Sequence, residues 1–309
     1  MKNLGIKAVI FVLFFVLIDL CIGLAFKQID NKVAKMPIDQ GSTYLQAVYH
    51  TNDDVVIFGE SMARGAYISP MMADSLNMSV SNFAYHGSSM VHQATVIRLM
   101  LKRFTPKVII WEVDGEMLMH KLDEEEKDRM WLIKPFYTTD SLSRQQVWRC
   151  GKYEKIKMLS AAYRNNNHLQ NMLRIMAHGN HADSLKGWVG LEVNGYKYPS
   201  KRKRMHQNDL SEEKLALFKS TVEVIKKAGS QLVIVNSPQY EESNLENTIQ
   251  GIAFEKVLTE YGIPHLNHHY DDLLLCDSTL FKDCDHLNYN GAVIYMNEFI
   301  PELKALLSK

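Results

Sequence analysis

The chain has 309 residues, 46% of them hydrophobic, so it is long enough for one large domain or two small ones whose core needs no disulfide framework. Its 35 Lys and Arg residues balance its 35 Asp and Glu residues. This balance does not indicate a nucleic acid or an acidic surface as a partner, and we expect no nucleic-acid-binding function.

The first segment is apolar from Ala8 to Phe26 except for Asp19. A helix rises about 1.5 Å per residue, so this run nearly covers a hydrocarbon core of about 30 Å. The alternative is a cleaved signal peptide. However, the apolar run is longer than the hydrophobic region of a typical signal peptide, and no Ala-x-Ala-like cleavage site follows it. We predict an uncleaved membrane anchor over residues 1–27, with the remaining chain outside the cytoplasm. Asp19 either marks a helix partner in the membrane or is a tolerated polar residue.

Beyond the anchor, short apolar runs alternate with segments of helical periodicity, which is typical of a parallel sheet with helices on both faces. We therefore predict one α/β domain over residues 28–309. The predicted strands are Val55–Phe58, Val80–Ala84, Val108–Val113, Gln231–Asn236 and Pro264–Asn267. The predicted helices are Pro70–Leu76, Thr95–Arg103, Ser211–Ala228, Asn247–Tyr261 and Asn290–Leu307.

The alternation stops over residues 116–208, which we interpret as an insertion over one edge of the sheet with a long helix at Tyr153–Met176. Four consecutive basic residues, Lys201–Arg204, form either a solvated loop or a patch for an anionic glycan or lipid head group. Nearby aromatic residues either stack on sugar rings or form the small core of the insertion: Trp188, Tyr196 and Tyr198.

The four cysteines are too few for a disulfide scaffold. Cys276 and Cys284 could form a disulfide outside the cytoplasm or remain free thiols, and both alternatives stay open because spacing does not fix the Cα separation. The cysteines show no paired Cys-x-x-Cys spacing, so we expect no metal site and no cofactor.

Polar residues follow the ends of several predicted strands. Ser61 comes after the first strand, Gly87 after the second and Asp114 after the third, while the loop Asp283–His286 precedes the last helix. In open parallel sheets ligands bind at the carboxyl ends of the strands. We expect these residues to face one crevice.

Ser61, Asp283 and His286 are the residue types of a nucleophilic triad, in that chain order. A serine hydroxyl is a poor nucleophile until a histidine removes its proton and a carboxylate orients that histidine. We predict that Ser61 is the nucleophile, His286 the base and Asp283 the orienting residue. Asp285 is a rival orienting residue, and a turn or helix cap is the alternative role for Ser61.

Three blocks of the sequence resemble the SGNH or GDSL-type esterases and acyltransferases: Ile57–Ser61, Asn82–Gly87 and Asp283–Asn288. The resemblance covers about residues 53–120 and 210–309. It implies a flavodoxin-like, three-layer α/β domain. It also implies that Asn82 and Gly87 belong to the oxyanion or substrate-binding site, while His86 either contacts the substrate or lies in a solvated loop.

The sequence departs from this family at three positions. Glu60 replaces the usual Asp, and Ala84 replaces the first Gly of the second block. The third block, Gly-x-Asn-Asp in the family, is Glu112–Glu116 here, which places Asp114 near the oxyanion site. An ionised carboxylate does not donate, and losing a donor costs on the order of a hundredfold to a thousandfold in rate. Either the backbone N–H groups of Ser61 and Gly87 suffice, or turnover is slow.

The resemblance implies an outward-facing serine esterase or O-acyltransferase acting on acyl esters, with acetyl expected, of cell-envelope carbohydrate. Divergent members with this appearance occur among membrane-anchored proteins, so a membrane-embedded acyl-transfer partner is a further expectation. The alternative is a catalytically inactive binding or assembly protein for envelope polysaccharide, because the acidic third block permits a decayed oxyanion site.

Overall fold

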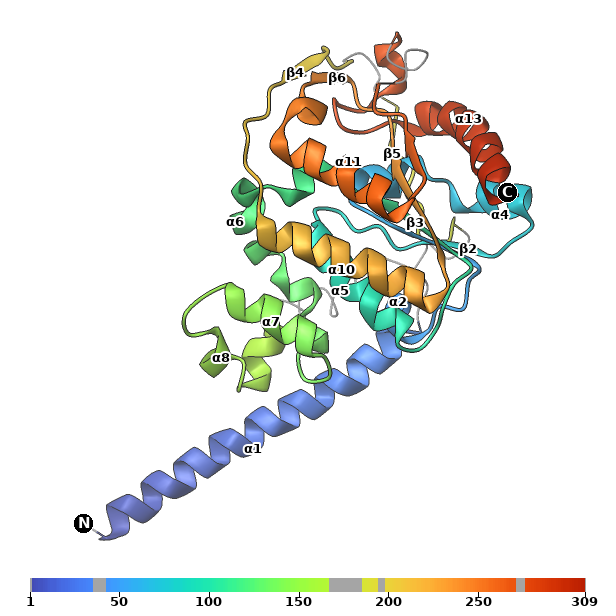
Figure 1. Ribbon diagram of the computed structural model, residues 1–309. Coiled ribbons are helices and arrows are strands. Elements are labelled where there is room, and N and C mark those ends of the chain that lie inside the picture. Colours follow the sequence, from blue (N-terminus) through green and yellow to red (C-terminus); the bar gives the residue numbers. More distant parts are fainter. Residues whose placement is uncertain (1, 36–42, 167–184, 194–197, 271–275, 309) are drawn as a thin grey trace.

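The computed structural model describes residues 2–35, 43–166, 185–193, 198–270 and 276–308 (Figure 1). Its helices are α1 (Lys2–Val33), α2 (Thr43–Tyr49), α3 (Ser61–Ala66), α4 (Ser69–Leu76), α5 (Met90–Leu101), α6 (Asp123–Asp128), α7 (Ser141–Arg149), α8 (Glu154–Lys157), α10 (Glu212–Ala228), α11 (Ile249–Tyr261) and α13 (Tyr289–Leu307). Its strands are β1 (Val55–Phe58), β2 (Val80–Asn82), β3 (Val108–Glu112), β4 (Arg202–Arg204), β5 (Gln231–Asn236), β6 (Glu241–Ser243) and β7 (His265–Asn267).

Five strands form a parallel sheet in the order β2-β1-β3-β5-β7. Counted along the chain, this is the doubly wound order 2-1-3-4-5, in which the direction of winding reverses between β1 and β3. The predicted fold class, a flavodoxin-like parallel sheet, is confirmed. The reversal places the ends of β1 and β3 at the position where such sheets bind ligands.

Alternate residues of each central strand pack into two separate cores. Val56 and Phe58 of β1 pack on the face covered by α2, α5, α10 and α11. Val55 and Ile57 pack on the opposite face, covered by α3, α4 and α13. Because both faces of the sheet are buried, the strands read as continuous apolar runs, and the domain has three layers.

The long helix α10 follows its local sequence signals. The Ser211 hydroxyl accepts a hydrogen bond from the backbone N–H of Lys214, and the helix ends at Gly229, whose φ is +89°. The glycine accommodates a left-handed conformation that a residue with a Cβ adopts at a cost. The prediction for this helix is confirmed to within one residue.

The region after α7 differs from the predicted long helix at Tyr153–Met176. α8 ends at Lys157, and a new helical stretch begins at residue 161 and is described to residue 166. The prediction of one continuous helix from Tyr153 is wrong, because the helix is interrupted at Leu159 and Ser160. Residues 167–176 lie outside the described ranges.

The basic segment Lys201–Arg204 is not a solvated loop. Its residues 202–204 form β4, which pairs in parallel with β6 in a separate two-stranded sheet. The acidic β6 lies directly opposite, with Arg202 beside Glu241. Charge pairing across the strands explains why a segment without apolar alternation forms a strand.

In the described part of the chain, α1 is the helix that is long and apolar enough to cross a membrane. Its apolar side chains from Val9 to Leu17 are exposed, whereas Val33 near its end is buried in the domain core. α1 therefore leaves the body as a long rod (Figure 1), and the prediction of a membrane-spanning length is confirmed.

Candidate active site

Ser61 is held at the carboxyl end of β1 by a tight turn into α3. The buried strand ends at Phe58, and α3 begins at Ser61 itself. A Cβ on Gly59 would lie 2.5 Å from Cβ of Ala63 and 2.9 Å from Cβ of Glu112. Only glycine lets the turn approach both α3 and β3 this closely, so Gly59 fixes the position of Ser61.

The loop before α13 brings His286 to Ser61. The Nε2 atom of His286 lies 2.7 Å from Oγ of Ser61, and its Nδ1 atom lies 2.8 Å from Oδ1 of Asp283. The same carboxylate oxygen accepts hydrogen bonds from the backbone N–H groups of Asp285 and His286. The three predicted triad residues form one continuous hydrogen-bonded series, although Ser61 and His286 are 225 residues apart.

The charges of this series suit a histidine base. Burial disfavours the ionised carboxylate of Asp283, but hydrogen bonds from His286 and from backbone N–H groups outweigh it and lower its pKa. Burial also disfavours protonated His286, yet the hydrogen bond and charge of Asp283 raise the pKa of His286 above its ordinary value. Asp283 is thus ionised and stabilises the imidazolium that forms when His286 accepts a proton.

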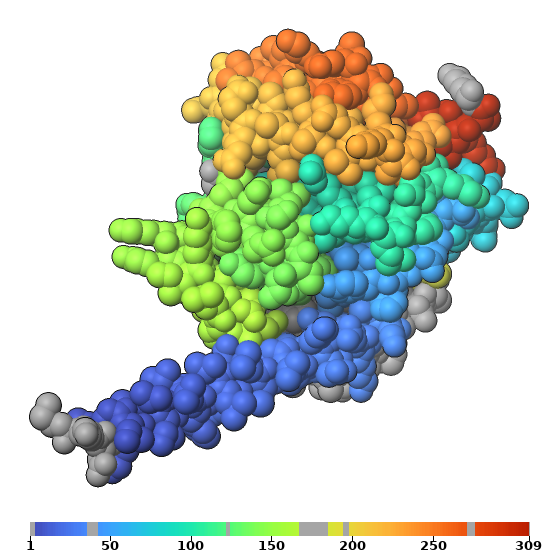
Figure 2. All heavy atoms as spheres, turned by 60° about the horizontal axis from the view of Figure 1, so that its bottom comes forward, coloured from blue at the N-terminus to red at the C-terminus, as the bar shows by residue number. Residues whose placement is uncertain are grey.

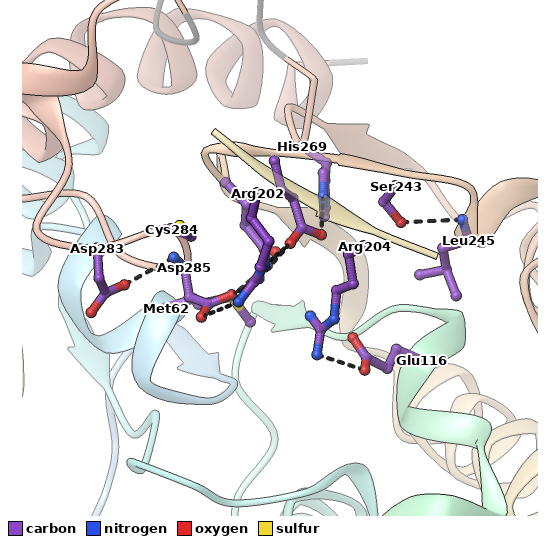
Figure 3. Close-up of polar contacts among 12 residues, drawn as sticks. Met62, Glu116, Arg202, Arg204, Ser243, Leu245, His269, Asp283, Cys284 and Asp285 are labelled. Carbon is purple, nitrogen blue, oxygen red and sulfur yellow. Dashed lines mark hydrogen bonds and ion pairs between the residues drawn. The ribbon is translucent and has the colours of Figure 1, made fainter. Parts of the chain in front are cut away.

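Asp285, the rival orienting residue, has a different partner. Its carboxylate forms an ion pair with the guanidinium of Arg202, which also pairs with Glu241 (Figure 3). On the same strand, the Nη2 atom of Arg204 lies 2.8 Å from Oε1 of Glu116. Arg202 of β4 therefore holds the loop that carries Asp285, whereas the hydrogen bond to Nδ1 of His286 comes from Asp283.

Ser61, His286, Gly87 and Asp114 line one cavity of about 220 Å³. The expectation that these strand-end residues face a common crevice is confirmed for these four. The cavity wall is rich in carboxyl groups: Glu60, Asp114, Glu116, Glu125, Glu126 and Asp285.

Burial and mutual repulsion raise the pKa values of several of these carboxyls. Burial, followed by the charges of Asp114 and Glu112, raises the pKa of Glu60 to about 8. Burial and the charge of Glu116 raise the pKa of Asp114 to about 6. Glu112, behind the cavity, has a pKa raised by burial to about 7 while Ser237 donates to its Oε1 atom. A fraction of these groups is therefore protonated near neutral pH, which weakens the repulsion expected from the third block.

Asn82 lies elsewhere than expected. Its side chain is fully buried, and its Nδ2 atom donates to the carbonyl oxygens of Ala63 (2.9 Å) and Tyr67 (3.1 Å). Its Oδ1 atom accepts from the backbone N–H of Ala84. Because all of these contacts are to backbone, the expected substrate-binding role is corrected to a structural one that ties α3 to the end of β2.

His86 is exposed and is not among the residues that line the cavity. Its carbonyl oxygen accepts a hydrogen bond of 3.0 Å from Nη1 of Arg129. The sequence left two alternatives for His86, and the structure supports the second, a position in a solvated loop.

Arg129, which the sequence did not indicate, contacts the second block close to the cavity, although it is not among the residues that line the cavity. A Cβ on Gly87, whose φ is +71°, would lie 2.6 Å from Cζ of Arg129. The absence of a side chain on Gly87 thus lets the guanidinium rest against the backbone of the second block. Arg129 lies within residues 116–208, where no motif distinguishes it from other charged residues.

Two further expectations concerned aromatic residues and cysteines. Trp188 is buried, and its Nε1 atom donates to the carbonyl oxygen of Gly65 (2.8 Å), so it belongs to the core and not to a sugar-stacking surface. Tyr198 is exposed, and Tyr196 lies outside the described residues. No disulfide joins Cys276 to Cys284. Within the described ranges, no group of three or more His, Cys, Asp or Glu residues is arranged to hold a metal ion.

No protein-family model matches the chain, and no curated protein matches it. Among solved structures, it is similar to the psychrotrophic esterase EstA from Pseudoalteromonas sp., in a structure inhibited by monoethylphosphonate. The match has a TM-score of 0.43 and 9% sequence identity, and it covers 83% of this chain and 100% of the esterase. At this level of similarity no residue role is transferred, and the function is inferred from the geometry of the site.

Proposed function

We propose that this protein is a membrane-anchored serine esterase or O-acyltransferase that acts outside the cytoplasm on acyl esters, principally acetyl esters, of cell-envelope carbohydrate. One observation carries the chemistry: Oγ of Ser61 lies 2.7 Å from Nε2 of His286, whose Nδ1 lies 2.8 Å from Asp283. Nucleophile, base and orienting carboxylate are all within hydrogen-bond reach, which is the geometry of a triad.

In the proposed reaction, His286 removes the Ser61 proton as Oγ attacks the carbonyl carbon of the ester. The tetrahedral intermediate collapses, its C–O bond to the alcohol breaks, and the alcohol leaves with the proton from His286. The acyl group is then bound to Ser61. Water, or a sugar hydroxyl, gives a proton to His286 and attacks the acyl carbon. The bond from this carbon to Oγ of Ser61 then breaks, His286 returns the proton to Oγ, and an acid or a new ester is released.

The negative oxygen of the intermediate requires donors near Ser61. The backbone N–H groups of Ser61 and Gly87 are the proposed donors, since both residues line the cavity. The guanidinium of Arg129, packed against Gly87 just outside the residues that line the cavity, is the proposed source of positive charge near these two N–H groups. The protonated fractions of Glu60 and Asp114 limit the opposing charge.

The proposal also includes a substrate and a location in the cell. α1 supports attachment to a membrane, and the resemblance of the three motif blocks supports an envelope carbohydrate as substrate and a membrane-embedded partner as acyl donor. The acidic cavity wall favours one second candidate, a catalytically inactive polysaccharide-binding protein, because carboxylates oppose an oxyanion.

Covalent labelling by a fluorophosphonate separates these two candidates. The probe reacts only with a serine that is activated by a base. We expect labelling of the wild-type chain and of Ser141→Ala, an exposed control serine on α7, and none of Ser61→Ala. An unlabelled wild-type chain with a native circular dichroism spectrum would favour the binding protein.

A further inference from the structure

The single acidic residue in the apolar run of α1 has its partners within the same chain. The Asp19 carboxylate accepts hydrogen bonds from Oγ of Ser160 (2.6 Å) and from the backbone N–H groups of Ala161 (2.7 Å) and Ala162 (2.9 Å). These N–H groups belong to the first turn of the helical stretch at residues 161–166. A carboxylate at this position satisfies the otherwise unpaired donors of a helix N-terminus, so Asp19 needs no partner helix from another protein.

A second contact on the same face of α1 shows that the two helices meet closely. A Cβ on Gly23, one helical turn after Asp19, would lie 3.0 Å from Cβ of Ala161. Ala161 itself is buried. Small residues on both sides permit this approach, and the segment around residue 160 is thereby fixed to α1.

This attachment lies inside the apolar run, not beyond its end. Phe26 ends the run seven residues after Asp19, and at about 1.5 Å per residue Ser160 is held about 10 Å along α1 from that end. Interfacial segments of proteins enter the boundary between head groups and acyl chains to a depth of about 5–10 Å. When α1 crosses a membrane, the chain around Ser160 is therefore at the level of the lipid interface.

The residues that precede Ser160 have the composition of such a segment. Tyr153, Ile156 and Leu159 are 59%, 68% and 78% exposed. Lys152 and Lys155, which flank them, are also exposed. Apolar and aromatic side chains bordered by lysines are typical of surfaces that rest in a membrane interface. Figure 2 shows light-green side chains of this region projecting on the same side as the free part of α1.

We propose that residues 152–160 form a membrane-contact surface, through which the body rests on the bilayer beside α1. Tyr153, Ile156 and Leu159 enter the acyl-chain boundary, and Lys152 and Lys155 lie among anionic lipid head groups. The two attachments, α1 and this surface, keep the body from swinging freely on its anchor. The inference relies on α1 crossing the membrane, as in the proposed function, and is independent of the chemistry at Ser61.

The test uses the full chain in lipid vesicles, with its native cysteines replaced by serine and one new cysteine carrying an environment-sensitive fluorophore. Ile156→Cys reports on the proposed surface. Ile252→Cys on α11, 58% exposed, is the matched control on the body, and Leu13→Cys reports the insertion of α1 itself. The vesicles contain lipids with a spin label on the acyl chain, which quenches fluorophores at that depth.

We expect blue-shifted and quenched emission at residues 13 and 156 and neither effect at residue 252. Quenching at residue 13 with none at residue 156 would overturn the proposal while leaving the anchor intact, and it is the result expected if another membrane protein covers this surface. We also expect stronger quenching at residue 156 when the vesicles contain phosphatidylglycerol, and loss of that increase in Lys152→Glu/Lys155→Glu. Equal quenching with and without the anionic lipid would overturn the electrostatic part.

Discussion

Separate local contacts position each member of the hydrogen-bonded series formed by Ser61, His286 and Asp283. Gly59 allows the tight turn after β1, Asp283 closes a turn on the N–H groups of its own loop, and Asn288 caps α13 by accepting from the N–H of Gly291. The Asp-x-x-His spacing thus predicts the observed hydrogen bond from sequence. The position of Arg129 could not be predicted, because it depends on how the segment around Arg129 folds over Gly87.

The raised pKa of His286 predicts a pH profile. Catalysis needs the neutral imidazole, so kcat/KM should rise with pH through an apparent pKa above about 6.5. Asp283→Asn removes the charge that favours the imidazolium, which should move this limb to lower pH and reduce the rate on the order of a thousandfold or more. The comparison variant is Asp285→Asn: the charge of Asp285 raises the pKa of His286 less than Asp283 does, so its limb should move to lower pH by less than that of Asp283→Asn. A limb displaced only in Asp285→Asn would contradict the assignment of the orienting residue.

A role for Arg129 in the transition state predicts a loss of kcat with little change in KM. Arg129→Ala should lower kcat on the order of a hundredfold if the guanidinium stabilises the oxyanion, and Arg129→Lys should restore only part of it. Arg144→Ala, a partly exposed arginine of α7 that contacts backbone carbonyls, is the control. Arg129→Ala with wild-type kcat would remove Arg129 from the proposed mechanism.

At the scale of elements, the sequence predicted the parallel strands and most large helices, because buried strands and capped helices leave local signals. α10 ends at a glycine and β5 matches its predicted bounds. β4 was missed because it contains only basic residues, and its pairing depends on the distant β6. The interruption of the helix before Ser160 was missed because Asp19, which accepts the hydrogen bond from Ser160, is 141 residues away.

The corrected role of Asn82 predicts an effect on stability and not on substrate affinity. Asn82→Ala leaves buried backbone groups of α3 and of the β2 end without partners, which should lower the free energy of unfolding by roughly 2 kcal/mol or more in urea titrations. Asn52→Ala, at an exposed position, should change it by less than about 0.5 kcal/mol. Unchanged stability in Asn82→Ala together with a raised KM would restore the substrate-binding role.

At the scale of the molecule, the alternation of apolar and amphipathic segments predicted the three layers, and the apolar first segment predicted a helix long enough to cross a membrane. Neither pattern predicted how the body sits against α1, because that depends on contacts between α1 and the segment around Ala161. The proposed function joins two separate features, a helix long enough to cross a membrane and a cavity lined by Ser61 and His286. The strength of that account depends on whether Ser61 is chemically active.

The most direct test is the hydrolysis of a small chromogenic acetate ester by the full chain in detergent. Wild-type protein and Ser141→Ala are compared with Ser61→Ala and His286→Ala, all with native circular dichroism spectra. The account predicts turnover in the first pair and its loss to the uncatalysed background in the second. The same background rate in all four proteins would contradict an enzyme and indicate a binding protein built on this α/β fold.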